Sequence, residues 1–188
     1  MTKILFLDFG VLNDTSMYQN IDNNPIKQEY YNRKKIVKNF IWERLKDYNN
    51  PYQAKLWTIA DLDYEKVILL NKIVKETDCK IVFSTSWRGD GVKNLALLLT
   101  LLGFQYPENC IDYTCFDRDG IRGLQISDWL IENMEFYEEI RYAILDDEMF
   151  DIREYHMQEV LFQTDGKVSG LTEEVCERVI EWLNGEDK

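Results

Sequence analysis

The sequence has 188 residues, of which 45% are hydrophobic and 13% aromatic, and its formal net charge is −12. This composition excludes an intrinsically disordered chain and is sufficient for a full hydrophobic core, so we expect one domain over residues 1–188. The negative charge argues against general nucleic-acid binding, which depends on cations that neutralise phosphates.

No membrane-spanning or targeting segment is expected. The richest apolar run, Ala96 to Gly103, is far shorter than the roughly 20 residues that cross a membrane. Near the N-terminus, Asp8 interrupts the apolar residues too early for a signal peptide. The four cysteines are scattered and are expected to be reduced, and His156, the single histidine, is expected at the surface. These features predict a cytoplasmic protein and leave its oligomeric state open.

The first predicted element is a strand over Lys3 to Asp8, whose apolar residues indicate burial on both faces of a parallel sheet. The segment that follows, residues 13–62, differs in character. It begins with an Asn- and Asp-rich stretch that predicts a loop, and residues 27–48 predict an amphipathic helix. We expect this segment to form a small helical cap inserted into a core of residues 1–12 and 63–188.

The predicted cap is basic in an otherwise acidic chain. From Lys27 to Lys55 there are eight Lys and Arg residues and three Asp and Glu residues, a net charge of +5 that leaves −17 for the remaining residues. Tyrosines and a tryptophan are interleaved with the basic residues, a combination suited to an anionic substrate with a ring that can stack, such as a nucleotide. The alternative is a solvated basic face over buried aromatic side chains.

The rest of the chain alternates helices with strands. Hydrophobic spacing predicts helices over residues 63–77, 92–102 and 124–134, a final helix from a capping Thr172 to Leu183, and buried strands over residues 80–84, 141–145 and 159–165. Residues 104–122 are irregular, with a possible short strand. This alternation predicts an α/β fold, a Rossmann-like parallel sheet with helices on both faces.

Polar residues stand at the ends of three predicted strands: Asp8, the hydroxyl run at residues 84–86, and Asp146 with Asp147. The carboxyl ends of parallel strands form the ligand-binding edge of such sheets, so these residues should meet in space. Carboxylates gathered at one edge repel each other unless a cation lies among them, and oxygen ligands without His or Cys suit Mg²⁺. For any one strand end, capping of the next helix is an alternative explanation.

The runs "LFLDFGVLN", "KIVFSTSWR" and "YAILDDE" together resemble the first, second and fourth motifs of the haloacid-dehalogenase-like (HAD) phosphatase superfamily. "IRGLQISDWL" and "VLFQTDGKVSGLT" resemble the phosphatase-like domain of bacterial Swiss army knife RNA-repair proteins. The resemblance covers nearly the whole chain. It implies a Mg²⁺-dependent phosphomonoester hydrolase that acts through an aspartyl-phosphate, on a small phosphorylated substrate such as a nucleotide or an RNA or DNA end.

The resemblance also implies roles for the matching residues. Asp8 would be the nucleophile and a Mg²⁺ ligand, and Ser84 would be the phosphate-binding hydroxyl of the second motif. Asp146 would bind the metal with assistance from Asp147. Arg122 would be the cation of the third motif, and Arg88 is the alternative for that role. The residues expected to contact substrate are Gly10, Thr85, Ser86 and Arg88.

The first motif departs from the family pattern. The superfamily has Asp-x-Asp-Gly, in which the second Asp is a general acid and base, whereas this chain has Asp8, Phe9 and Gly10 in succession. The loss of such a group costs roughly 10²–10⁴-fold in rate. The alternative hypothesis is therefore a catalytically impaired module that retains phosphate or nucleotide binding.

Overall fold

The computed structural model describes residues 1–13, 62–165 and 169–185. The predicted cap over residues 13–62, with its helix over residues 27–48 and its basic charge, therefore lies almost wholly outside the described residues. Among the helices that are described, none has the length and apolar character needed to cross a membrane.

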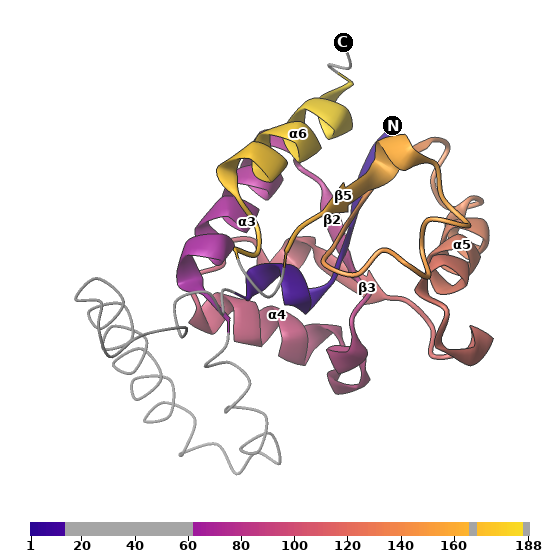
Figure 1. The fold of residues 1–188 in the computed structure, drawn as a ribbon, viewed down its shortest axis with the longest axis horizontal. Coiled ribbons are helices and arrows are strands. Elements are labelled where there is room, and N and C mark those ends of the chain that lie inside the picture. The colour runs from indigo at the N-terminus through magenta and orange to yellow at the C-terminus, as the bar shows by residue number, and fades with distance from the viewer. Residues whose placement is uncertain (14–61, 166–168, 186–188) are drawn as a thin grey trace.

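The described residues form an α/β fold around a five-stranded parallel sheet, in the order β3-β2-β1-β4-β5. This confirms the predicted fold class, and Figure 1 shows β2, β3 and β5 of this sheet among the helices. The strands are β1 (Thr2–Leu7), β2 (Lys80–Phe83), β3 (Cys110–Tyr113), β4 (Ile140–Asp146) and β5 (Leu161–Gln163).

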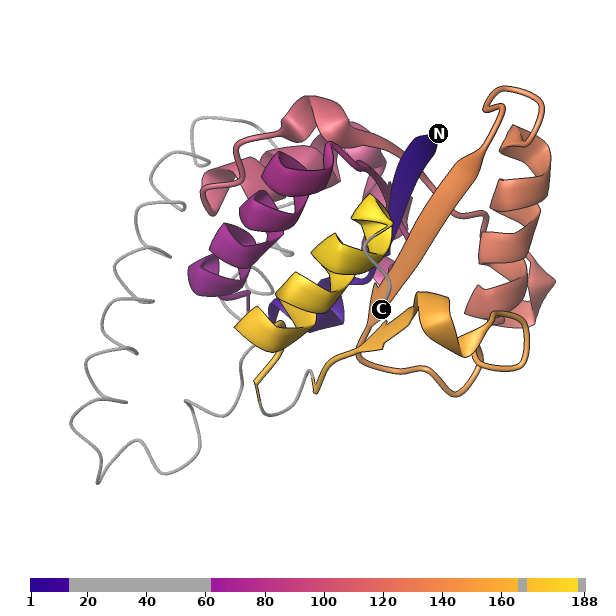
Figure 2. The same ribbon diagram turned by 90° about the horizontal axis from the view of Figure 1, so that it is seen from above.

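In the described part of the chain, four α-helices cover the sheet: α3 (Tyr64–Thr77), α4 (Val92–Leu101), α5 (Arg122–Asn133) and α6 (Glu173–Asn184). Side chains of α3, α4 and α6 share one hydrophobic cluster with Leu5 and Leu7 of β1. Side chains of α5 share a second cluster with Ile4 and Phe6. Successive β1 residues point to opposite faces, so helices lie on both faces as predicted, and Figure 2 shows α5 across the sheet from α3 and α6.

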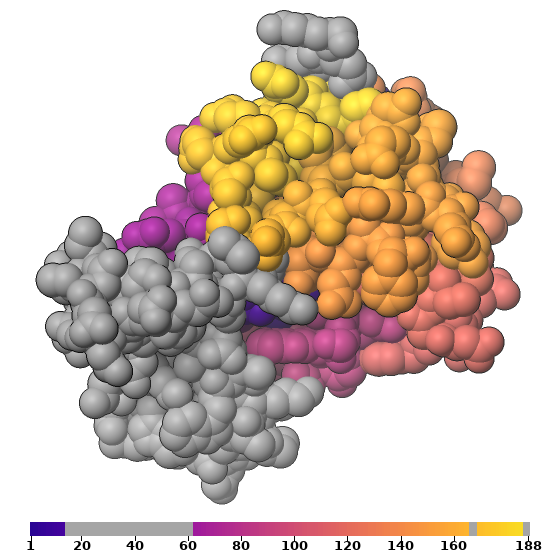
Figure 3. Space-filling view, in the orientation of Figure 1, coloured from indigo at the N-terminus to yellow at the C-terminus, as the bar shows by residue number. Residues whose placement is uncertain are grey.

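The central strand β1 has a neighbouring strand on each side. Its last four residues are fully buried, because it pairs with β2 on one side and β4 on the other. In the space-filling view the indigo N-terminal residues show only as a small area between the orange and magenta segments (Figure 3). A strand apolar on both faces is the expected result of this position.

Local signals explain several helix ends. The carboxylate of Asp63 accepts a hydrogen bond from the backbone of Glu65 at the start of α3, and Thr172 accepts one from Val175 at the start of α6. The Thr172 cap was predicted from the sequence. In contrast, α5 begins at Arg122, two residues before the predicted start, and the strand predicted over residues 159–165 is limited to β5.

The prediction of a surface position for His156 is wrong. Only 9% of the residue is exposed, because its ring is packed under the start of α5. Nε2 lies 2.9 Å from the carbonyl oxygen of Gly123, to which it must donate, so Nδ1 accepts from the hydroxyl of Tyr142 at 3.1 Å. Burial lowers the pKa of His156 and favours this neutral ring.

Candidate active site

The polar ends of β1, β2 and β4 meet at one edge of the sheet, as predicted. The backbone nitrogen of Asp8 donates to Leu145, the neighbour of Asp146, at 3.0 Å, and that of Ser84 donates to Leu7 at 2.9 Å. A pocket of about 640 Å³ opens at this edge. Its lining comes from four segments: Asp8, Phe9, Gly10 and Asn13; Thr85, Ser86, Trp87 and Arg88; Phe116, Gly120 and Arg122; and Asp147, Glu148, Phe150 and Asp151.

Three carboxylates form the acidic centre of this site. Asp8, Asp146 and Asp147 each offer an oxygen within 4.8 Å of the others. Burial is the main cause that raises the pKa of both Asp8 and Asp146, and neighbouring carboxylates raise both further. Asp146 is only 1% exposed. A cation bound among these carboxylates would favour their ionised forms.

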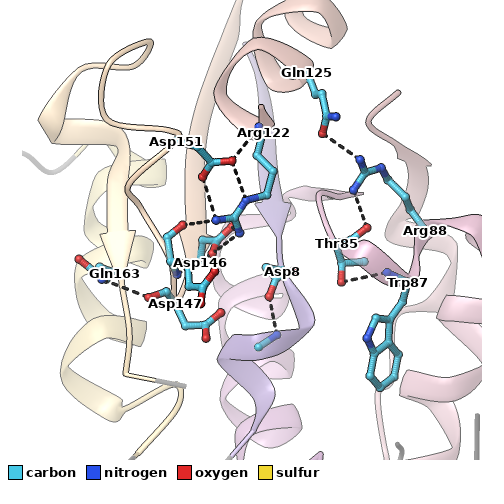
Figure 4. A network of polar contacts seen from close by, with 12 residues as sticks. Asp8, Thr85, Trp87, Arg88, Arg122, Gln125, Asp146, Asp147, Asp151 and Gln163 are labelled. Carbon is cyan, nitrogen blue, oxygen red and sulfur yellow. Dashed lines mark hydrogen bonds and ion pairs between the residues drawn. The ribbon is translucent and has the colours of Figure 1, made fainter. Parts of the chain in front are cut away.

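Among the described residues, Arg122 is the cation that forms an ion pair with these carboxylates (Figure 4). Its Nη1 donates to both oxygens of Asp146, at 2.7 and 2.8 Å, and its Nη2 donates to Oδ1 of Asp151 at 2.9 Å. The backbone nitrogen of Arg122 also donates to Asp151 at 3.0 Å. The guanidinium is therefore fixed in direction, with one edge on the acidic centre.

Gly123 explains how α5 can begin so close to the loop after β4. A Cβ added there would lie 2.6 Å from a ring carbon of Tyr155 and 2.7 Å from the carbonyl oxygen of Asp151. No side chain fits in this space. The glycine that follows Arg122 thus allows that arginine to reach Asp146.

Asp151 was missed by the sequence interpretation. It lies five residues after Asp146 in the run "DDEMFD", and that spacing of acids was the available signal. Gln125 was also missed. It is fully buried, and its position four residues before the buried Trp129 places both on the inner face of α5.

Each of the three guanidinium nitrogens of Arg88, the alternative cation, donates a hydrogen bond to the protein. Nη1 donates to the carbonyl oxygen of Thr85 at 2.7 Å, Nη2 to Oε1 of Gln125 at 2.9 Å and Nε to the carbonyl oxygen of Cys115 at 3.1 Å. Its guanidinium carbon lies 4.7 Å from the ring centre of Phe116. Arg88 lines the pocket, but its hydrogen bonds tie together three segments of the chain.

The three hydroxyl residues after β2 differ in position. Thr85 and Ser86 line the pocket, whereas Ser84 does not. The hydroxyl of Ser84 is buried without a hydrogen-bond partner among the described residues. The hydroxyl of Thr85 accepts from the backbone nitrogen of Trp87 at 3.4 Å. The Thr85 side chain also lowers the pKa of Asp8 by hydrogen bonding, although burial has the larger, opposite effect. Of the three hydroxyl residues, Thr85 is thus the one that acts on the Asp8 carboxyl group.

The shortened first motif has a compact geometry. Phe9 is buried and packs edge-on against Phe83 and Trp87, with ring centres 5.6 and 5.2 Å away. This turn places the backbone nitrogen of Gly10 2.6 Å from Oδ2 of Asp8, so the carboxylate accepts a hydrogen bond from its own loop. That bond lowers the pKa of Asp8 but does not offset the effect of burial.

Comparison with known proteins gives one family match. The family model described as "HAD domain in Swiss Army Knife RNA repair proteins" matches residues 4–176. The match includes every strand end at the pocket and α5. Searches of curated proteins and of solved structures give no significant match.

Proposed function

Because the chain belongs to the family of HAD domains in Swiss Army Knife RNA repair proteins, we propose that it is a Mg²⁺-dependent phosphomonoester hydrolase. The observation that carries this proposal is the meeting of Asp8, Asp146 and Asp147 at one sheet edge, beside Arg122 and above a pocket. Carboxylates, a cation and hydroxyls at the carboxyl ends of parallel strands suit phosphate chemistry.

The carboxylates fit Mg²⁺ as ligands. Oδ1 of Asp146 accepts from both Arg122 and the backbone of Glu148, but Oδ2 accepts from Arg122 only and keeps one lone pair. Asp8 and Asp146 would hold the ion, and Asp147 offers a third oxygen within reach. Bound there, the ion would supply positive charge to Asp8 and to the phosphate oxygens.

The residues of the pocket have separate tasks in the proposed reaction. Asp8 attacks phosphorus, the ester P–O bond breaks, and an aspartyl-phosphate forms that water then hydrolyses. Arg122 supplies positive charge beside the phosphoryl oxygens. Its guanidinium N–H groups donate to Asp146, to Asp151 and to the carbonyl oxygen of Glu148, and these bonds hold that charge at the acidic centre. The Thr85 hydroxyl, which lines the same pocket as Asp8, orients the phosphate. Ser84 takes that role only if its buried hydroxyl turns toward the pocket.

The substrate we propose is a phosphate on a nucleotide or a nucleic-acid end. The family description refers to RNA repair. At the described rim of the pocket, Phe116 and Phe150 are 56% and 76% exposed, and such aromatic rings can stack on a base. The basic face predicted within residues 27–48 would add positive charge, but it lies outside the described residues.

An aryl phosphate assay tests this proposal. We expect wild-type protein to release phosphate with Mg²⁺ and not with EDTA, and Asp8→Asn to be inactive. Glu154→Gln, which removes an exposed carboxylate beyond the pocket, is the matched control. Activity that survives both EDTA and Asp8→Asn would refute the mechanism.

The shortened motif favours a second candidate, a binding module without turnover. Gly10 offers no acid where the family has one. In that case calorimetry would detect phosphate or nucleotide binding to a wild-type protein that shows no hydrolysis.

A further inference from the structure

Phe116 is an exposed aromatic residue whose neighbours in the chain are held by the protein. It follows β3, lines the pocket and is more than half exposed. Before it, the carbonyl oxygen of Cys115 accepts a hydrogen bond from Nε of Arg88 at 3.1 Å. After it, the carbonyl oxygen of Asp117 accepts one from Nε2 of Gln125 at 2.7 Å. The backbone is therefore bound on both sides of the Phe116 ring.

The two side chains that donate these bonds are themselves fixed. Arg88 follows β2 and is buried, and Gln125 lies on α5 and is fully buried. Nη2 of Arg88 donates to Oε1 of Gln125 at 2.9 Å. An exposed ring adds little to the core, but a ring held in place before binding loses less conformational entropy when a ligand stacks on it. The arrangement therefore suits a binding residue.

The ring of Phe116 keeps an open surface at the pocket. The guanidinium carbon of Arg88 lies over the ring, 4.7 Å from its centre, and the ring centre of Tyr113 is 6.2 Å away at an interplanar angle of 54°. The residue remains more than half exposed despite these two contacts, and it lines the same pocket as Asp8. An open aromatic surface in a phosphate pocket suits a nucleobase, because every base has a face that stacks.

We infer that Phe116 selects substrates that carry a nucleobase, and that Arg88 and Gln125 are positioning residues that hold its ring. This inference rests on the proposed function, to which it adds the place of the base. The phosphate lies at Asp8 and the base stacks on Phe116. Sugar phosphates, which have no ring that stacks, are then poor substrates.

Adenosine 5′-monophosphate and ribose 5-phosphate test this inference, because they carry the phosphate on the same sugar position and differ at the base. Wild-type protein should prefer the nucleotide in kcat/KM by roughly 5–150-fold, the contribution of one base stacked on an aromatic ring. Phe116→Leu keeps the apolar bulk and removes the ring. It should lose most of the preference through a higher KM for the nucleotide, with kcat and the kinetics of ribose 5-phosphate unchanged. Phe116→Trp should retain the preference.

Phe150→Leu is the matched control, because Phe150 is the other exposed phenylalanine of the described lining. It should leave the preference unchanged. Gln125→Met, which removes the bond to Asp117, should raise the KM for the nucleotide and not for ribose 5-phosphate. In the Phe116→Leu background it should cause no further loss of preference, because Gln125 acts through the ring. A Gln125 that only stabilises the fold would affect both substrates alike.

Equal kcat/KM for the two compounds in wild-type protein would overturn the inference. So would a preference that Phe150→Leu removes and Phe116→Leu does not. Calorimetry on Asp8→Asn measures binding of the same two compounds without turnover, and adding Phe116→Leu should weaken only the binding of the nucleotide. If wild-type protein hydrolyses no phosphate ester, the proposed function fails, and calorimetry still decides the inference. Nucleotide binding that is no tighter than that of ribose 5-phosphate would refute it.

Discussion

Nη1 of Arg122 lies 2.7 and 2.8 Å from the two carboxylate oxygens of Asp146. The cation that we propose for the phosphate and the carboxylate that we propose for the metal are therefore bound to each other. Asp151 completes this pairing by binding the other side of the guanidinium. The pairing keeps the arginine from turning outward into solvent, which favours a preorganised site.

Arg122→Ala should lower kcat and kcat/KM together by at least about 10²-fold, because it removes a preorganised group that stabilises the transition state. Steady-state kinetics on an aryl phosphate measures this. Arg122→Lys should recover only part of the activity, since an ammonium cannot contact Asp146 and Asp151 in the same planar geometry. Full activity in Arg122→Ala would mean that another residue stabilises the transition state.

Arg88→Ala should mainly destabilise the fold. The substitution removes the donor that Arg88 supplies to Oε1 of the buried Gln125 and to the carbonyl oxygen of Cys115, at a cost of about 1–3 kcal/mol for each buried group that stays unpaired. Thermal unfolding should show a lower Tm, while the remaining folded protein keeps most of its kcat. If kcat falls and Tm does not, Arg88 and not Arg122 is the cation that acts on phosphate.

Mg²⁺ should stabilise the protein more as the pH rises. Burial and neighbouring carboxylates raise the pKa of Asp8 to about 6 and that of Asp146 to about 8, from an ordinary 3.8. The folded protein then holds protons that the unfolded chain has lost, so stability without metal falls as pH rises from about 4 to about 8. Mg²⁺ binds the deprotonated carboxylates and offsets this loss.

Thermal unfolding from about pH 5 to about pH 8 checks this linkage. Tm without metal should fall across the range, and the increase on adding Mg²⁺ should be largest at the upper end. Asp146→Asn, which cannot ionise, should weaken both effects. A Mg²⁺ shift that is the same at every pH would contradict the assignment of these carboxylates as ligands.

Gly10→Ala should lower Tm, since its Cβ would meet the carboxylates of Asp147 and Asp8 at 2.0 and 2.7 Å. Overpacking of this kind typically costs about 1–3 kcal/mol. Asp147→Ala removes the closer contact, so Gly10→Ala should cost less in that background. Denaturant unfolding of the two single variants and the double variant gives the coupling. Purely additive effects would mean that the two residues do not share this space.

Much of the core could be predicted from local pattern. The apolar runs of β1, β2 and β4 and the helical spacing of α3 and α6 are properties of short segments, so they show in the sequence. Once a parallel sheet is inferred, its geometry places the residues after each strand at one edge. For this reason Asp8, the hydroxyl run at residues 84–86 and Asp146 could be expected together without coordinates.

Which of these groups contact each other depended on tertiary packing. Several hydrogen bonds join residues that are distant in the chain. Arg122 donates to Asp151, Arg88 donates to Gln125, and the buried ring of His156 donates to Gly123. Side-chain chemistry alone does not select among such partners, because an arginine can bind any acid that packing brings near. The meeting of Gly10 with Asp147 is of the same kind. The sequence by itself determined the strands and their acidic ends. Only the packing of β1 beside β4 decided that the carboxylate of Asp147 lies where a side chain at Gly10 would be.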